Sequence, residues 1–207
     1  MNLLERATII HFHRHRIEAF GRDDVMSLGW RNADSQQKRF EVIASLADFN
    51  RSTVLDVGCG RGDLKAFLDG RFNDVAYMGI DQMPEFIADA NARYTNGTPC
   101  RFYEGDFTTA AFPRVDYVVA SGALGYRTDD ADFLFDMICR LFASSARATI
   151  FNVLDAQHFP DHPLLMGRDC DEVIAYCRTL SPHIEVVRGY LPDDMTVCIS
   201  RPAAEMS

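Results

Sequence analysis

The sequence lacks the features of several classes of protein. No run of eighteen or more apolar residues occurs in its 207 residues, so we expect no membrane-spanning helix. Its first segment, Met1–Ala7, carries Glu5 and Arg6 where a secretory signal would have an apolar stretch. None of the six cysteines forms a CxxC pair and no cysteine/histidine spacing predicts a zinc site, so we expect no metal. These absences favour a cytoplasmic protein whose cysteines are reduced and mostly buried.

Basic charge is also scarce. The chain has 21 Lys and Arg against 30 Asp and Glu, a formal net charge of −9. An acidic surface repels phosphates and anionic membranes, so we expect neither a nucleic acid nor a membrane as the partner. One local exception could bind an anion or could form a solvated helix face, and it comprises His11, His13, Arg14, His15 and Arg16.

The length and composition fit one domain. With 47% hydrophobic and 25% charged residues, the chain can bury one core, and no linker or repeat divides it. We expect a single domain over residues 1–207, made of an N-terminal helical cap (1–50) and a core (51–207).

The cap region predicts two helices. The first extends from Leu3 to about Ala19, and Gly21 ends it. The second follows Asp34 as N-cap, with Gln37 as its capping-box partner. The only tryptophan, Trp30, lies in the loop between them and either closes a pocket or anchors this region to the core.

From Thr53 onward, short apolar runs alternate with helical patterns. Such alternation predicts a parallel sheet covered by helices on both faces. About seven residues separate the last two runs, too few for a crossover helix, so these two strands should pair antiparallel. We therefore predict a doubly wound α/β fold with a mostly parallel seven-stranded sheet, one antiparallel strand near its edge, and N-terminal helices. The expected strands are Thr53–Val57, Val75–Ile80, Cys100–Tyr103, Val115–Ala120, Ala146–Leu154, His183–Val187 and Met195–Ser200.

The first strand leads into a glycine-rich turn, Asp56-Val57-Gly58-Cys59-Gly60-Arg61-Gly62. Glycine permits positive φ and lets a ligand approach the backbone closely. The spacing is GxGxG, whereas a nicotinamide-binding loop would be GxGxxG with a pyrophosphate at the helix N-terminus. An aspartate at the strand end suits a cation better than a phosphate, so the turn favours a ligand without phosphate.

Polar residues also follow the next three strands. Asp81 ends the second strand, Asp106 and Phe107 follow the third, and Ser121 and Gly122 follow the fourth. Each residue alone could be a turn former or a helix cap. Ligands of open parallel sheets bind at the carboxyl ends of the strands, so together these residues predict one site.

In this order the motifs resemble the class I (Rossmann-like) family of S-adenosylmethionine (SAM)-dependent methyltransferases, of the small bacterial type. The resemblance extends over Thr53–Leu154 and implies SAM as cosubstrate. In the family, the acid after the second strand binds the ribose hydroxyls and the aspartate after the third accepts from the adenine amino group. The resemblance thus implies that the cofactor-binding residues are Asp56, Gly58, Cys59, Gly60, Asp81, Gln82, Met83, Asp106, Phe107, Ser121 and Gly122.

The upstream segment, Leu28–Trp30 and Gln36–Phe40, resembles one found in small bacterial methyltransferases whose N-terminal helices cap the cofactor. This implies that Arg39 could pair with the SAM carboxylate through a forked contact, with Gln37 assisting. The alternative is that Arg39 is a surface charge and Gln37 only a capping residue.

The acceptor is less well defined. The Asn/Asp-Pro-Pro-aromatic tetrad of amide and DNA N-methyltransferases and the Pro-Cys pair of cytosine C5 enzymes are absent from residues 121–124. A general base is needed only when the acceptor must lose a proton. The polar candidates near the predicted site are Tyr126, Asp155, His158, His162 and Tyr190, and we take Tyr126 and His158 as the candidate bases. His158 could also be an exposed histidine without a function, in the irregular stretch after the fifth strand.

We therefore expect a methyltransferase acting on an unidentified small-molecule acceptor. A SAM-binding partner or sensor without catalysis is the first alternative. A nicotinamide-dependent oxidoreductase on the same general fold is the second, because fold alone does not decide function.

Overall fold

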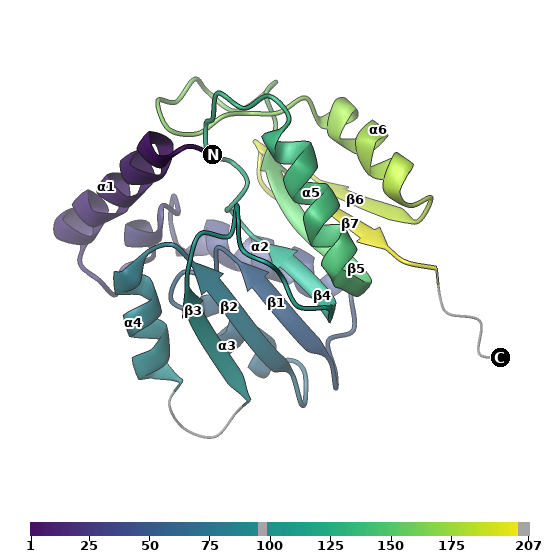
Figure 1. Cartoon of the computed structure of the whole chain (residues 1–207), viewed down its shortest axis with the longest axis horizontal. Helices are drawn as coiled ribbons and strands as arrows, with labels where there is room; N and C mark the ends of the chain where they lie inside the picture. Colours follow the sequence, from purple (N-terminus) through teal and green to yellow (C-terminus); the bar gives the residue numbers. More distant parts are fainter. Residues whose placement is uncertain (95–98, 203–207) are drawn as a thin grey trace.

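The computed structural model describes residues 1–94 and 99–202. Its sheet has seven strands in the order β3-β2-β1-β4-β5-β7-β6 (Figure 1). Strand β7 is antiparallel to both of its neighbours, and the other pairings are parallel. The predicted sheet is therefore confirmed, with its reversed strand next to the edge. The strands are β1 Thr53–Val57, β2 Ala76–Asp81, β3 Cys100–Glu104, β4 Val115–Ala120, β5 Ser145–Leu154, β6 Ile184–Arg188 and β7 Asp194–Ser200.

Helices cover both faces of the sheet. Helices α2 (Ala33–Ser45), α3 (Asp63–Asp69) and α4 (Pro84–Arg93) pack on one face, and α5 (Phe133–Ser144) and α6 (Cys170–Leu180) pack on the other. Figure 1 shows α5 in front of the sheet and α2 and α3 behind it. Coverage of both faces explains why the central strands are continuous apolar runs rather than alternating ones.

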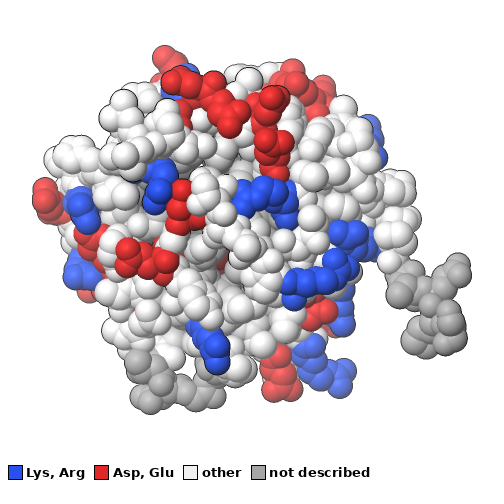
Figure 2. Space-filling model, viewed as in Figure 1, with Lys and Arg blue, Asp and Glu red and all other residues white. Residues whose placement is uncertain are grey.

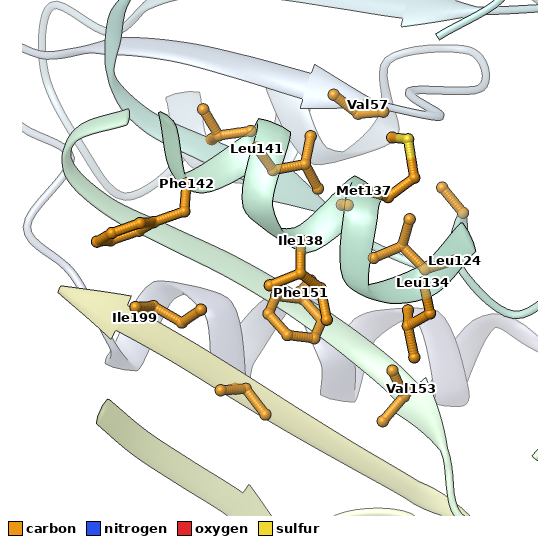
Figure 3. Close-up of a cluster of buried hydrophobic side chains, with 14 of the residues drawn as sticks. Val57, Leu124, Leu134, Met137, Ile138, Leu141, Phe142, Phe151, Val153 and Ile199 are labelled. Carbon is orange, nitrogen blue, oxygen red and sulfur yellow. The ribbon is translucent and has the colours of Figure 1, made fainter. Parts of the chain in front are cut away.

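The core on the α5 face shows how the helical spacing becomes packing. Ile138 and Leu134 of α5 lie beside Phe151 and Val153 of β5 (Figure 3), and Leu141 belongs to the same cluster; the three helix side chains are at most 1% exposed. Burying each such side chain contributes roughly 1.5–3 kcal/mol. This packing holds β4 and β5 in register, so the residues that follow them have defined positions.

The second helix begins two residues earlier than predicted. Its N-cap is Asn32, whose side chain accepts from the Ser35 backbone and whose own N–H is bonded by the Ser35 hydroxyl. Asp34 lies in the first helical turn and pairs with Lys38, while Gln37 bonds Glu41. The predicted capping box of Asp34 and Gln37 is therefore wrong, because Asn32 adopts the extended backbone that an N-cap requires.

Helix α1 (Leu3–Phe20) lies beyond the carboxyl ends of β1 and β2 (Figure 1), followed by a short 3₁₀ helix, η1 (Val25–Leu28). Only Ile9 and His13 of α1 are buried, so α1 has no broad apolar face. Charged groups instead attach it to the core, among them Arg6 to Asp106 and Arg14 to Glu85. The helix is thereby placed as a cover over the strand ends.

The surface in Figure 2 carries acidic groups along its upper edge and basic side chains in small separate groups. In the described part of the chain, no helix has both the length and the apolar character to cross a membrane.

Candidate functional site

A cavity of about 190 Å³ lies at the carboxyl ends of the central strands, beneath α1 and η1. Nearly all of the site residues proposed from the sequence line it. The exceptions are Asp106, His158 and Gln37. The lining residues among them are Arg39, Asp56, Gly58, Cys59, Gly60, Asp81, Gln82, Met83, Phe107, Ser121, Gly122 and Tyr126.

The glycine turn adopts a conformation that other residues rarely use. Gly58, Gly60 and Gly62 have φ values of +76°, +53° and +75°. A Cβ at Gly58 would lie 2.5 Å from the Cβ of Ala123, and one at Gly60 would lie 2.9 Å from a methyl of Leu28. The turn is thus pressed between the loop after β4 and η1, with its backbone at the cavity.

Asp81 connects the glycine turn to α4. Its buried carboxylate accepts the Gly60 N–H and the Met83 N–H, both at 2.9 Å. Burial raises the pKa of Asp81, and these backbone bonds oppose that rise. Because each carboxylate oxygen can accept about two bonds, Asp81 keeps capacity for hydroxyl donors from a ligand.

Asp56 is buried beneath the same turn. The Tyr77 hydroxyl donates to its carboxyl group. Burial, together with the charges of Asp81 and Asp63, raises the pKa of Asp56 to about 7, and the Tyr77 hydrogen bond opposes this rise. Within the described residues, neither Asp56 nor Asp81 has a basic side chain as an ion-pair partner. This end of the cavity therefore carries uncompensated acidic groups, which favours a positively charged ligand.

Arg39 lines the cavity with its charge already paired. Its guanidinium forms an ion pair with Asp194 and lies over the Trp30 ring at 4.8 Å from the centroid. Asp194 also accepts from the Asn152 side chain at 2.7 Å, and the Asn152 oxygen accepts the Gly122 N–H at 2.6 Å. This chain of contacts fixes the loop after β4 at the cavity wall.

Trp30 fills both roles left open by the sequence. It lines the cavity and also packs edge-on against Phe40, with ring centroids 6.0 Å apart. The glutamine beside the cavity is Gln36 rather than Gln37, and its side chain donates to Asp63 at 3.0 Å. Gln36 precedes Phe40 by one helical turn, and this spacing was the signal that could have identified it.

Asp106 and His158 lie away from the cavity wall. Asp106 pairs with Arg6 at 3.0 Å and accepts the Thr108 N–H and hydroxyl. Burial alone would raise the pKa of Asp106, but the Thr108 bonds and Arg6 bring it below its usual value. His158 is 58% exposed and contacts Asp155, whereas its neighbour Phe159 reaches the cavity.

His13 is a cavity residue that the sequence did not single out as one. It was grouped with the basic cluster of α1, yet it is only 4% exposed, while His11 and His15 are exposed. Its Nδ1 lies 3.1 Å from the Ser27 carbonyl oxygen and its Nε2 lies 2.6 Å from the Tyr126 hydroxyl. Burial lowers the pKa of His13 to about 4, so it is neutral at pH 7. His13 follows Ile9 by four residues and so lies on the same face of the helix, and this spacing was the signal that could have identified it as buried.

Comparison with known sequences identifies the domain type. Residues 54–145 match a family model described as a methyltransferase domain. The chain is 33% identical over 109 residues to a Mycobacterium tuberculosis protein named as a methyltransferase, Rv1506c, covering 49% of this chain and 63% of that protein. It is 28% identical over 99 residues to trans-aconitate 2-methyltransferase of Escherichia coli, covering 47% of this chain and 38% of that protein. The chain therefore spans less than two thirds of the curated relatives it matches.

Solved structures give the fold over almost the whole chain. DhpI in complex with S-adenosylhomocysteine (SAH) superposes with a TM-score of 0.70 at 17% identity, covering 99% of this chain and 100% of DhpI. Magnesium protoporphyrin IX methyltransferase from Synechocystis PCC 6803, also with SAH bound, gives a TM-score of 0.68 at 14% identity, covering 94% of this chain and 100% of that chain. At such identities the agreement establishes the architecture alone.

Proposed function

We propose that this chain, a member of the Rossmann-like SAM-dependent methyltransferase family, binds SAM in the cavity and transfers its methyl group to a small-molecule acceptor. The family model matches the region from β1 to the end of α5. The cavity lies at the strand ends where ligands of such sheets bind.

The observation that carries this proposal is the acidic end of the cavity. Asp56 and Asp81 are both buried, on the neighbouring strands β1 and β2, without an ion-pair partner in the described part of the chain. SAM carries a sulfonium and an ammonium group, and their positive charge favours this environment. The pyrophosphate of a nicotinamide dinucleotide would be repelled by the same carboxylates, which disfavours the oxidoreductase alternative.

Further groups fit the remaining parts of SAM. Asp81 has acceptor capacity for the two ribose hydroxyls, and Met83 and Phe107 are buried apolar side chains that would flank the adenine. Among the residues that the structure describes, the buried Ser121 hydroxyl has no hydrogen-bond partner, although it lines the cavity. A buried polar group of this kind is costly unless a ligand satisfies it. We assign the adenine contact to Phe107, since Phe107 lines the cavity and Asp106 does not.

A small acceptor fits the shape of the site. The cavity is roofed by α1 and η1, and part of its lining is apolar, formed by residues such as Phe12, Phe159 and Leu165. A covered cavity admits a metabolite more readily than a polymer. The relatives named for trans-aconitate also support a small acceptor.

The chemistry requires little of the protein. The sulfonium is an activated leaving group, so alignment of the two partners and exclusion of water supply most of the catalysis. The cover formed by α1 and the apolar wall both exclude water. The arrangement therefore suits in-line transfer of the methyl group to a nucleophile bound in the same cavity.

Isothermal titration calorimetry with SAM, SAH and NAD tests the cofactor. We expect binding of SAM and SAH, no binding of NAD, and about tenfold or greater weakening in Asp81→Asn through loss of charge-assisted bonds. Asp34→Asn is the matched control, because Asp34 is exposed on α2 and contacts only Lys38. Tight NAD binding, or equal SAM affinity in both variants, would contradict the proposal.

Incubation with methyl-labelled SAM and a pool of bacterial metabolites separates an enzyme from a binder. We expect SAH and a labelled small product to form in equal amounts. If SAH binds tightly and no pool yields a labelled product, the alternative of a partner or sensor protein gains support.

A further inference from the structure

One polar pair is set into the apolar wall of the cavity. His13 of α1 and Tyr126, after β4, both line the cavity and are bonded at 2.6 Å. The rings of Phe12 and Phe86 lie edge-on to His13, with centroid distances of 5.2 and 5.4 Å. The pair thus combines hydrogen-bonding groups with an environment that holds little water.

The direction of the hydrogen bond follows from the chemistry of the partners. The Ser27 carbonyl oxygen can only accept, so the Nδ1 of His13, 3.1 Å away, carries the ring proton. The Nε2 of the neutral ring is then an acceptor, and the Tyr126 hydroxyl donates to it. Tyr126 has no other proton to donate, whereas its oxygen retains acceptor capacity for a ligand.

We infer that the Tyr126 oxygen accepts the hydroxyl proton of the methyl acceptor and that His13 is the positioning residue that gives Tyr126 this polarity. The inference rests on the proposed function and adds the acceptor class to it, namely an aromatic or similarly apolar alcohol. The apolar lining residues, among them Phe12 and Phe86 beside His13, select the body of such a molecule, and the Tyr126 oxygen selects its hydroxyl.

In the proposed reaction, methyl transfer and proton transfer occur together. The acceptor oxygen forms a bond to the methyl carbon while the carbon–sulfur bond breaks and its electron pair remains on SAH. The hydroxyl proton passes to the Tyr126 oxygen as the Tyr126 proton passes to Nε2 of His13. The products are SAH, the methyl ether and a protonated His13, which later releases its proton to water.

A weakly basic histidine is sufficient for this step. Burial, followed by the nearby Arg16 charge, disfavours the protonated form of His13, and its pKa is about 4. An alcohol oxygen that is receiving a methyl group becomes an oxonium, which is much more acidic than imidazolium. Proton transfer is therefore downhill, and such a relay typically accelerates a reaction by about 10²–10⁴-fold. Burial likewise raises the pKa of Tyr126, which keeps its hydroxyl protonated before the step.

Phenol and anisole, two probes that differ by the hydroxyl proton, test the inference on the SAH-saturated protein. Titration followed by NMR should show phenol binding about threefold to tenfold more tightly than anisole, the worth of one hydrogen bond. Tyr126→Phe should abolish this preference, and His13→Phe should weaken it, with SAH affinity unchanged in both variants. His158→Gln, on the exposed loop, should leave the preference intact.

The ¹⁵N resonances of His13 provide a readout that a merely structural role would not determine. We expect the Nδ1-protonated neutral tautomer at pH 7. The Nε2-protonated tautomer would make Tyr126 a donor to the cavity and would overturn the inference. An unchanged phenol preference in Tyr126→Phe would overturn it as well, as would absence of any phenol preference in the native protein.

Two further outcomes have distinct meanings. Weakened SAH binding in Tyr126→Phe would assign the hydroxyl contact to the ribose of the cosubstrate and overturn the acceptor role. Failure of the native protein to bind SAH would contradict the proposed function itself, and the phenol comparison would then not be reached.

Discussion

The hydroxyl of Tyr77 donates to the carboxyl group of Asp56 inside the sheet, where β1 and β2 lie side by side. Both side chains are buried. Asp56 pairs in register with Gly79, and the absence of a side chain at Gly79 leaves room for the side chain of Cys59. A carboxyl group in this position is costly to ionise without a cation. Because a cationic ligand would favour the ionised carboxylate, the effect of Asp56 on the stability of the sheet depends on the charge of the ligand.

Replacing Asp56 by Asn should stabilise the unliganded protein at high pH. The folded-state pKa of Asp56 is about 7 against an ordinary 3.8, so its contribution to stability is present below pH 3.8 and is lost as the pH rises through 7. We expect Asp56→Asn to raise the free energy of unfolding at pH 8 by about 2–4 kcal/mol, measured by urea denaturation. The same variant should bind SAM more weakly, and a gain in both stability and SAM affinity would contradict the role given to the carboxylate.

His13 should give the opposite pH dependence. Its pKa falls from 6.5 to about 4 on folding, so the stability it confers is present above pH 6.5 and is lost as the pH falls toward 4. Between these values the native protein should lose about 3 kcal/mol from this group. Urea titrations of His13→Phe should lack this component, and those of His15→Phe, an exposed neighbour on α1, should retain it.

The ion pair of Arg39 and Asp194 should contribute more to the free energy of unfolding than the neighbouring ion pair of Arg31 and Asp193. The Asp194 side chain is fully buried and that of Arg39 is 13% exposed, so Asp194→Asn leaves a charge without its partner inside the protein. We expect a loss of about 3 kcal/mol in the free energy of unfolding. The control is Asp193→Asn. The Asp193 side chain is also buried, but its partner Arg31 is 58% exposed and keeps its hydration when the pair is broken, so this variant should cost less, about 1 kcal/mol. Equal losses of unfolding free energy in the two variants would show that the buried pair of Arg39 and Asp194 has no special role in supporting the cavity wall.

Two glycines of the turn should respond differently to alanine. At Gly58 the new Cβ would meet the Cβ of Ala123 at 2.5 Å, so Gly58→Ala should lower the melting temperature strongly. At Gly60 it would meet the flexible end of Leu28 at 2.9 Å, so Gly60→Ala should mainly weaken SAM binding. Gly70→Ala is the control, because Gly70 has helical φ and ordinary contacts. Calorimetry and thermal denaturation of the three variants distinguish these effects.

The strands and the cavity wall were predictable because their signals are local. Apolar runs such as Val115–Ala120 are buried on both faces, and their composition alone predicts strands. Parallel strands direct their carboxyl ends to one edge, so residues there converge regardless of side-chain detail. The start of α2 was misplaced because two acceptable N-cap residues, Asn32 and Asp34, lie two positions apart and only the backbone conformation distinguishes them.

The sequence by itself determined the parallel sheet, its single reversed strand and the identity of the residues at the strand ends, since each depends on spacing within a few residues. Only the tertiary structure decided which polar groups meet. Arg39 forms an ion pair with Asp194, and Asp106 forms one with Arg6. His13 is hydrogen-bonded to Tyr126, which is 113 residues away in the chain. These pairings depend on how α1 and α2 pack over the sheet, and residue periodicity carries no information about contacts between distant segments.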